Sequence, residues 1–401
     1  MLIEIHAIQN HSPANLNRDD LGAPKTCYFG GALRSRISSQ CLKRSIRMSD
    51  EFKSLRGAIR TRRLAQLLGG DDEGLRARAA EVLKSCGIAP KEKSDSDSSA
   101  GLVFVTRAAV NEMKQLLQAG TKKDKELAKE FAQIIAHCTA APDMALSGRM
   151  LEPKSEKEKK PRNAESNDAD AEKAEKNEDV WKGLKPGVEA ALQVAHAIST
   201  HEARPEVDYY VAADDIPGAD AGAGFVDEAM FASACFYKYF SIDWDDLVRN
   251  LTGFDGDREK LAAHTVGAFI RAAALANPTG KQNAHAAHNP PDGILVEIRE
   301  SGTPISYANA FAKPVNTDQR NIIEQSIAQL AQYAYDLDEG YGRPTKRFWF
   351  SPNNRYSLTS DEQSLADTNL RKIDDLVSET VRKIGFEWED VRRVVINPED
   401  A

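Results

Sequence analysis

The feature that most constrains the fold is a charged tract near the middle of the chain, residues 152–179. It consists mainly of Lys, Glu, Asn, Asp and Ala, and it has almost no apolar side chains that could join a core. We therefore expect a mobile, solvated insertion between two folded parts of the chain. A charged arm that contacts a partner is the alternative interpretation.

The rest of the composition is typical of a soluble globular protein. A chain of 401 residues with 41% hydrophobic and 28% charged residues can form a large core and two or three lobes. The sequence has no run of about 18 apolar residues and begins with a strand-like alternation, so we expect no membrane span and no signal peptide. With no export signal, we expect a cytoplasmic protein. The five cysteines are scattered and form no CxxC pair, which argues against disulfides and a zinc site.

The net charge of −8, taken alone, argues against a nucleic-acid-binding protein. The charges are unevenly distributed, however. Residues 18–63 contain 12 Lys and Arg against four Asp and Glu, a balance of +8 that leaves −16 for the remainder. A basic face on an acidic body can bind a polyanion locally and repel it elsewhere.

Apolar periodicity predicts short strands mixed with helices. The predicted strands are at residues 2–8, 209–211 and 294–298, and residues 27–37 fit a strand or a hairpin. The predicted helices are at residues 188–198, 243–251, 258–276, 322–337 and 365–384. Residues 231–240 fit either a helix or a strand, and residues 55–138 have the spacing of a helical lobe inserted into a sheet domain. This mixture predicts an α+β fold with appended lobes.

The most informative pattern lies in residues 38–47. If Ser38 or Ser39 caps a helix there, Leu42 and Ile46 fall on one side and can pack against a sheet. Another face of that helix then carries Gln40, Lys43, Arg44 and Arg47. Cationic side chains and a helix N-terminus both suit phosphate, and phosphate contacts position nucleic acid without reading its sequence. A solvated basic helix face is the alternative, and the spacing alone does not decide between them.

Several short blocks, taken in order, resemble the CasC-type backbone subunit of the type I-E CRISPR Cascade complex. The blocks in the first part of the chain are His11-Ser12-Pro13, Leu16-Asn17-Arg18-Asp19-Asp20, Phe29-Gly30-Gly31 and Arg36-Ile37-Ser38-Ser39-Gln40 with Leu42-Lys43-Arg44. The later blocks are Ala145-Leu146-Ser147-Gly148-Arg149-Met150, Ala195-His196-Ala197-Ile198 with Thr200-His201, Asp214-Asp215, Gly280-Lys281-Gln282 and Ala308-Asn309-Ala310-Phe311. The resemblance runs from near residue 1 to about residue 342, and residues 50–143 match only in general character.

This resemblance implies a hand-like fold with an RRM-like (ferredoxin-like) palm, an inserted helical fingers lobe and a β-hairpin thumb. We expect the palm at residues 1–54 and 188–401, with the thumb at about 201–225. The fingers would occupy residues 55–150, and residues 151–187 would form the charged insertion.

The same resemblance implies a non-catalytic subunit that binds crRNA. Copies would stack head to tail along the guide spacer, and each thumb would kink the guide at regular intervals and leave the segments between kinks free to pair with target DNA. The implied partners are the crRNA, target DNA through the guide, further copies of the chain, and the large, small, end-capping and crRNA-processing Cascade subunits. No cofactor, metal or membrane is implied.

Carried over by position, the resemblance also assigns RNA-binding residues. Those expected at the guide backbone are Arg18, Lys25, Ser38, Gln40, Lys43, Arg44, Arg47 and Lys281. Met150 would be an apolar wedge beside the kinked nucleotide, with core filling as the alternative. Tyr209 and Tyr210 would stack on bases from the thumb, with ordinary sheet packing as the alternative. The charged tract beside Met150 looks like an insertion relative to the family, and the thumb is unusually rich in Gly and Ala.

Two other hypotheses follow from the residues. Paired carboxylates can hold a divalent ion for phosphodiester cleavage, so Asp19 and Asp20 suggest a metal-dependent endoribonuclease, with turn capping or salt bridging as the alternative. His285 and His288 have metal-like spacing, but only Asp292 is near them in the sequence. The chain could also be an assembly protein with no nucleic-acid role.

Overall fold

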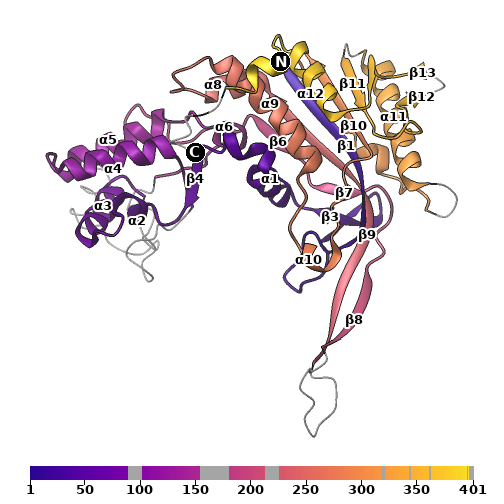
Figure 1. The fold of residues 1–401 in the computed structure, drawn as a ribbon, viewed down its shortest axis with the longest axis horizontal. Coiled ribbons are helices and arrows are strands. Elements are labelled where there is room, and N and C mark those ends of the chain that lie inside the picture. The colour runs from indigo at the N-terminus through magenta and orange to yellow at the C-terminus, as the bar shows by residue number, and fades with distance from the viewer. Residues whose placement is uncertain are drawn as a thin grey trace, which may run out of the picture. The chain divides into compact units, whose positions relative to one another are not determined.

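The computed structural model (Figure 1) describes residues 1–88, 102–153, 180–212, 225–317, 321–342, 345–360, 363–394 and 396. The chain divides into two compact units. Unit 1 comprises Met1–Lys53, Gln193–Asp243 and Val266–Arg392. Unit 2 comprises Ser54–Leu192, Trp244–Thr265 and Arg393–Ala401. None of the helices in the described ranges is long and apolar enough to cross a membrane.

Unit 1 is built on one large mixed sheet with two long central strands, β1 (Leu2–Ala14) and β9 (Phe225–Asp243). The strand order is β14-β11-β10-β1-β9-β7-β3-β2, and β6 and β8 also pair with β9. The other strands are β2 (Thr26–Phe29), β3 (Ala32–Ile37), β6 (Leu192–Val194), β7 (Ala197–Ser199), β8 (Glu206–Ala212), β10 (Gly293–Arg299), β11 (Lys346–Phe350) and β14 (Thr368–Leu370). A separate small pair is formed by β12 (Thr359–Ser360) and β13 (Gln363–Ser364).

Both faces of this sheet are covered. Residues 2–9 of β1 are all buried, and because successive side chains of a strand point to opposite faces, each face must be packed. Helix α11 (Ile322–Tyr341) covers one face, where Leu330 packs with Tyr237 of β9. On the other face, Phe236 clusters with Leu42 of helix α1 (Ser39–Met48).

Further helices complete unit 1 and the connections. Phe240 of β9 makes an edge contact with Phe269 of α9 at a ring-centroid distance of 5.5 Å. The remaining helical segments here are η1 (Asp50–Leu55), α9 (Arg258–Leu275), α10 (Gln282–His285), η3 (Ala308–Phe311), α12 (Ile373–Lys383) and α13 (Trp388–Val391). Helix α12 packs against β10, β11 and β14.

The α11 side of the sheet contains a buried ionic network centred on Glu297 of β10. Its carboxylate accepts hydrogen bonds from Arg347 Nε at 2.5 Å and from the Tyr307 hydroxyl at 2.8 Å, and His6 Nε2 lies 3.3 Å from Oε2. Burial alone would raise the pKa of Glu297, but the hydrogen bonds and charges of His6 and Arg347 lower it to about 2. The network therefore holds an ionised carboxylate inside the fold.

Unit 2 is a helical lobe with a small strand pair, β4 (Ala58–Thr61) and β5 (Val103–Thr106). Its helices are α2 (Leu64–Gly69), α3 (Glu73–Ser85), α4 (Arg107–Ala119), α5 (Asp124–His137), α6 (Pro142–Ser147) and α8 (Trp244–Asn250). Its core gathers Leu83, Met113 and Phe131 from successive helices. Trp181 joins that core, and its indole N–H donates to the Cys86 carbonyl at 2.8 Å.

The predicted α+β class is confirmed, and so are most of the predicted elements, but two predictions are wrong. The helix predicted at residues 365–384 forms only over α12, because residues 368–370 pair with β11 as β14. Residues 188–198 have helical spacing, yet they supply β6 and β7. Sheet pairing overrides the local pattern there, because Ile198 lies opposite Arg36 of β3 on one side and opposite Tyr237 of β9 on the other. Residues 231–240, which fitted either element, are strand. Residues 154–179 of the charged tract and residues 213–224 of the predicted thumb lie outside the described residues.

Candidate nucleic-acid interface

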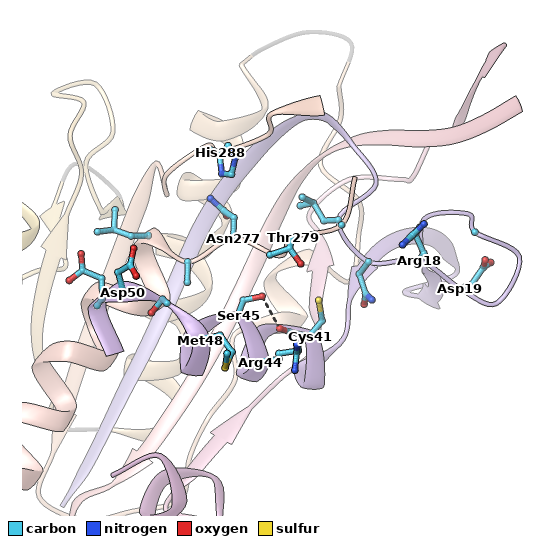
Figure 2. A pocket seen from close by; sticks show the side chains of 18 of the residues that line it. Arg18, Asp19, Cys41, Arg44, Ser45, Met48, Asp50, Asn277, Thr279 and His288 are labelled. Carbon is cyan, nitrogen blue, oxygen red and sulfur yellow. Dashed lines mark hydrogen bonds between the residues drawn. The ribbon is translucent and has the colours of Figure 1, made fainter. Parts of the chain in front are cut away.

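An open groove of about 1080 Å³ lies beside α1 in unit 1 (Figure 2). One wall is α1 with the start of η1, a second is the loop at residues 16–22, and a third is residues 275–280 with His288. Figure 2 shows Arg44, Ser45 and Met48 projecting from the helix. Every lining residue belongs to unit 1, so the groove is a feature of one compact body.

Helix α1 forms as its sequence predicts, with Ser38 as the capping residue. The Ser38 hydroxyl accepts from the Cys41 N–H at 3.4 Å, and the Ser38 N–H donates to Asn17 Oδ1 at 2.9 Å. The first bond caps the helix, and the second ties its start to the loop that forms the opposite wall. Leu42 and Ile46 are buried, which fixes the rotation of the helix.

That rotation turns the polar face of α1 outward. Gln40 and Arg44 are exposed, and Lys43 and Arg47 are half-buried. We call these four residues the α1 ridge. The first turn of the helix has no acidic residue and Arg47 lies in its last turn, so the ridge carries cations without an acidic side chain in its own helix.

The loop opposite α1 holds Arg18 close to the groove. The backbone of Arg18 bridges to Pro24, and the Lys25 N–H donates to the Asn17 carbonyl at 2.8 Å, so the loop closes on itself. Asp19 Oδ1 accepts from two backbone N–H groups of that loop, each at 2.9 Å. Arg18 is exposed and lines the groove, whereas Lys25 is half-buried beside a smaller neighbouring cavity.

Acidic residues occupy part of the same groove. Asp50 and Glu51 line it together with Asp20, and Glu51 accepts from Arg271 Nε at 2.8 Å. In Figure 2, Asp50 lies at one end of the groove and Arg18 at the other. The Asp50 end of the groove is therefore acidic, whereas at the other end Arg18 lies beside Asp19, whose Oδ1 is engaged by backbone N–H groups.

Lys281 is held close to this region by a tight backbone approach. Gly280 lines the groove, and a Cβ at that position would lie 2.5 Å from the Leu16 carbonyl oxygen, so only glycine fits. Lys281 follows in a left-handed conformation with φ of 51° and is exposed. The sequence pattern missed the neutral polar residues Asn277 and Thr279 in the same wall, since they belong to no recognisable motif.

Met150 lies in unit 2, and its surroundings explain its exposure. Its side chain is 90% exposed, so the core-filling interpretation does not hold. Arg149, just before it, is only 3% exposed and donates from Nε to the Pro186 carbonyl at 2.8 Å. The Arg149 backbone also exchanges two hydrogen bonds with Val188, at 2.8 and 2.9 Å. Burial lowers the pKa of Arg149 to about 10, which keeps it charged at neutral pH.

Tyr209 and Tyr210 lie on the β8–β9 hairpin, which extends beyond the rest of the sheet in Figure 1. Because strand side chains alternate, the two tyrosines point to opposite faces of the hairpin. Tyr209 is 71% exposed on the face with Val207 and Val211. The Tyr210 hydroxyl donates to Asp227 Oδ2 at 3.1 Å, and this bond raises its pKa. The two rings therefore cannot stack on bases from the same side.

The histidines that have metal-like spacing are separated in the structure. His285 packs near the Phe231 ring at a centroid distance of 5.9 Å, whereas His288 lines the groove. Within the described parts of the chain, no group of three His, Cys, Asp or Glu side chains could hold a metal ion.

Comparisons with known proteins give two informative structural matches. A chain of a "CRISPR RNA-guided surveillance complex, pre-nicking" is 27% identical, with 96% of this chain and 100% of that chain covered and a TM-score of 0.75. A chain of a second "CRISPR RNA-guided surveillance complex" is 24% identical, with 96% and 99% covered and a TM-score of 0.58, and this likeness concerns the fold alone. No curated protein matches the chain. The model of the CT1975-like protein family matches residues 3–163 and 181–379, and the chain therefore belongs to that family.

Proposed function

We propose that this chain is a crRNA-binding backbone subunit of a CRISPR RNA-guided surveillance complex of the Cascade type, and specifically a CasC-type subunit of type I-E. The match over 96% of the chain to a subunit of such a complex supports the assignment. The observation that carries it is the α1 ridge, a serine-capped cationic helix face beside an open groove that also holds Arg18.

In this proposal the guide backbone runs along the α1 ridge. Arg44 and Arg18 contact phosphates from two walls of the groove, and Lys25 and Lys281 add contacts beside it. These side chains read charge and not base edges, so binding is independent of sequence and weakens as salt rises. The bases stay free to pair with target DNA. Unit 1 would be the RRM-like palm and unit 2 the fingers, with copies stacked along the spacer beside the other Cascade subunits.

Met150 and the hairpin supply the apolar contacts that bend the guide. An exposed methionine on a fixed backbone can enter between two bases and unstack them, at a cost of about a few kcal/mol. Tyr209 supplies a stacking face on the hairpin. The Tyr210 hydroxyl is engaged by Asp227, and Tyr209 is the more exposed of the two at 71% against 40%, which favours Tyr209 as the base-contacting ring.

We propose further that the subunit does not cut RNA. Asp19 Oδ1 is occupied in capping the groove loop, the turn-capping role that the sequence left open. Incubating the purified chain with single-stranded RNA and Mg²⁺ or Mn²⁺ tests this proposal, with intact RNA as the expected result. Cleavage that disappears in Asp19→Asn/Asp20→Asn would establish the endoribonuclease instead.

The main test is the triple variant Lys43→Ala/Arg44→Ala/Arg47→Ala. Binding of a labelled single-stranded RNA should weaken by roughly tenfold or more, and the slope of log K against log salt should fall by about 2, or 0.7 for each lost cation. A matched control removes three cations at the two ends of α12: Lys372, which precedes the helix, and Arg382 and Lys383 in its last turn. Equal effects of the two triple variants would mean that net charge, and not the ridge, drives binding.

A further inference from the structure

A buried lysine lies on the sheet face that the groove overlies. Lys238, in the middle of β9, is only 1% exposed. Among the described residues, its ammonium makes no hydrogen bond and no ion pair. A buried cation is ordinarily paired, since removing a charge from water costs several kcal/mol that a partner must offset.

The strand register places Lys238 beneath the groove. It shares a sheet face with Phe236, which packs with Leu42 of α1, and with Phe240, which packs against α9. Ala7 is its partner on β1, and Gln9, two residues further along, points to the same face. The Gln9 amide donates to Asn277 Oδ1 at 3.0 Å, and Asn277 lines the groove.

The titratable groups around Lys238 do not compensate its charge. Cys41 of α1, itself a groove residue, interacts with it electrostatically, but burial raises the pKa of that thiol and keeps it neutral. Burial and the Lys238 charge lower the pKa of His11, on β1, to about 3, so His11 is neutral as well. Lys25 and Arg44, which also interact electrostatically with Cys41, are basic residues. Cys41, His11, Lys25 and Arg44 thus supply no negative charge to Lys238, and the carboxylates of the groove rim do not shift its pKa.

Burial lowers the pKa of Lys238 from 10.5 to about 8, so the side chain is still mostly protonated at pH 7. The free chain therefore holds an unneutralised cation at a cost to its stability. A polyanion in the overlying groove would offset that cost, because the interaction passes through protein and not through water. A methionine would fill the same space without this cost.

We propose that Lys238 is a buried counter-charge for the phosphates of the nucleic acid in the groove, an inference that rests on the proposed RNA-binding function. Lys238 destabilises the free chain and strengthens binding of the phosphodiester backbone. Unlike the α1 ridge, it acts from beneath the surface and does not compete for hydrogen bonds with water.

The test uses Lys238→Met, with Lys372→Met as the control for the same loss of charge at an exposed site. The ligand is a labelled single-stranded oligoadenylate, whose bases do not titrate between pH 7 and 9. At pH 7 we expect roughly tenfold weaker binding by Lys238→Met together with a higher melting temperature. If Lys238 were merely structural, its replacement by Met would lower the melting temperature. That result would overturn the proposal, and so would an unchanged affinity.

The pH profile of the wild-type chain gives a second measurement that needs no variant. Since the free lysine titrates near pH 8, binding above that pH requires proton uptake, and affinity should fall by up to about tenfold between pH 7 and 9. A flat wild-type profile refutes the inference while leaving the proposed function intact. A wild-type chain that fails to bind the oligoadenylate at pH 7 would instead remove the proposed function itself.

Discussion

Gly148 is the residue on which the presentation of Met150 depends. Its φ of 71° and ψ of 170° lie in a region that essentially only glycine occupies. A Cβ at this position would lie 2.8 Å from the Val188 carbonyl oxygen and 2.9 Å from the Ala190 nitrogen, both backbone atoms. We therefore predict that Gly148→Ala displaces the backbone pairing that holds Arg149 and, with it, the exposed methionine.

The free energy of unfolding that Gly148→Ala should lose is the sum of two contributions. A non-glycine residue in this conformation costs about 1–3 kcal/mol, and overpacking against backbone atoms costs a further 1–3 kcal/mol or so. Gly183 provides a matched control in the same unit, because its φ is 77° but a Cβ at that position would have no atom within 4 Å. Gly183→Ala should therefore cost only about 1 kcal/mol.

Amide hydrogen exchange of residues 145–150 measures this difference locally, since exchange reports the free energy of local opening. A difference of about 3 kcal/mol corresponds to exchange on the order of a hundredfold faster in Gly148→Ala than in Gly183→Ala. If the two variants exchange at the same rate, the close approach to Val188 neither holds this loop nor fixes the position of Met150.

Three further predictions concern single side chains. Met150→Ala should retain RNA affinity but lose the fluorescence increase that 2-aminopurine in the guide shows when unstacked, and an undiminished increase would exclude the wedge. Tyr209→Ala should weaken RNA binding in an anisotropy assay by about 1–3 kcal/mol, whereas Tyr210→Phe should not, and equal losses would contradict the two-faced hairpin. The wild-type chain should lose about 3 kcal/mol of stability as pH falls from 4.5 to 2, because the buried histidine and arginine partners keep the pKa of Glu297 near 2. In Glu297→Gln, the free energy of unfolding, measured by urea titration at each pH, should fall less over the same pH range. An equal fall in the variant and the wild type would refute the coupling between Glu297 ionisation and stability.

Most of the correct predictions rest on patterns of residues that are close together in the sequence. Helix α1 could be placed because a capping serine precedes two apolar residues four positions apart, and both signals lie within ten residues. Strand β1 could be predicted from alternation alone, whereas residues 231–240 of β9 could not. Residues 188–198 could not, because their conformation is set by pairing with β3 and β9, and those partners come from distant parts of the chain.

The residues of the candidate site likewise divide into those that a local pattern predicts and those whose position depends on distant parts of the chain. The α1 ridge is a property of one helix, so its residues could be named from spacing. The exposure of Met150 depends on backbone pairing with Val188, across the charged tract, which no local pattern contains. Lys238 has a signal in the sequence that belongs to no motif. It is the one charged residue among the aromatic residues of 236–240, and the sheet pairing, which the sequence left open, shows that both faces of this segment are buried.

Charge counts along the chain overstate the basic surface, and the structure explains how a chain of net charge −8 can still bind a polyanion. Arg34 belongs to the basic segment, yet it is fully buried and donates to backbone carbonyls such as those of Ser199 and Phe311. It fixes connections in the fold and is not accessible to phosphate. Of the cations that remain in that segment, three lie on α1 and two on the adjacent loop, where they act within a Debye length of about 8–10 Å. Beyond that distance the acidic remainder is screened, so local concentration of charge, and not the total, decides where RNA is held.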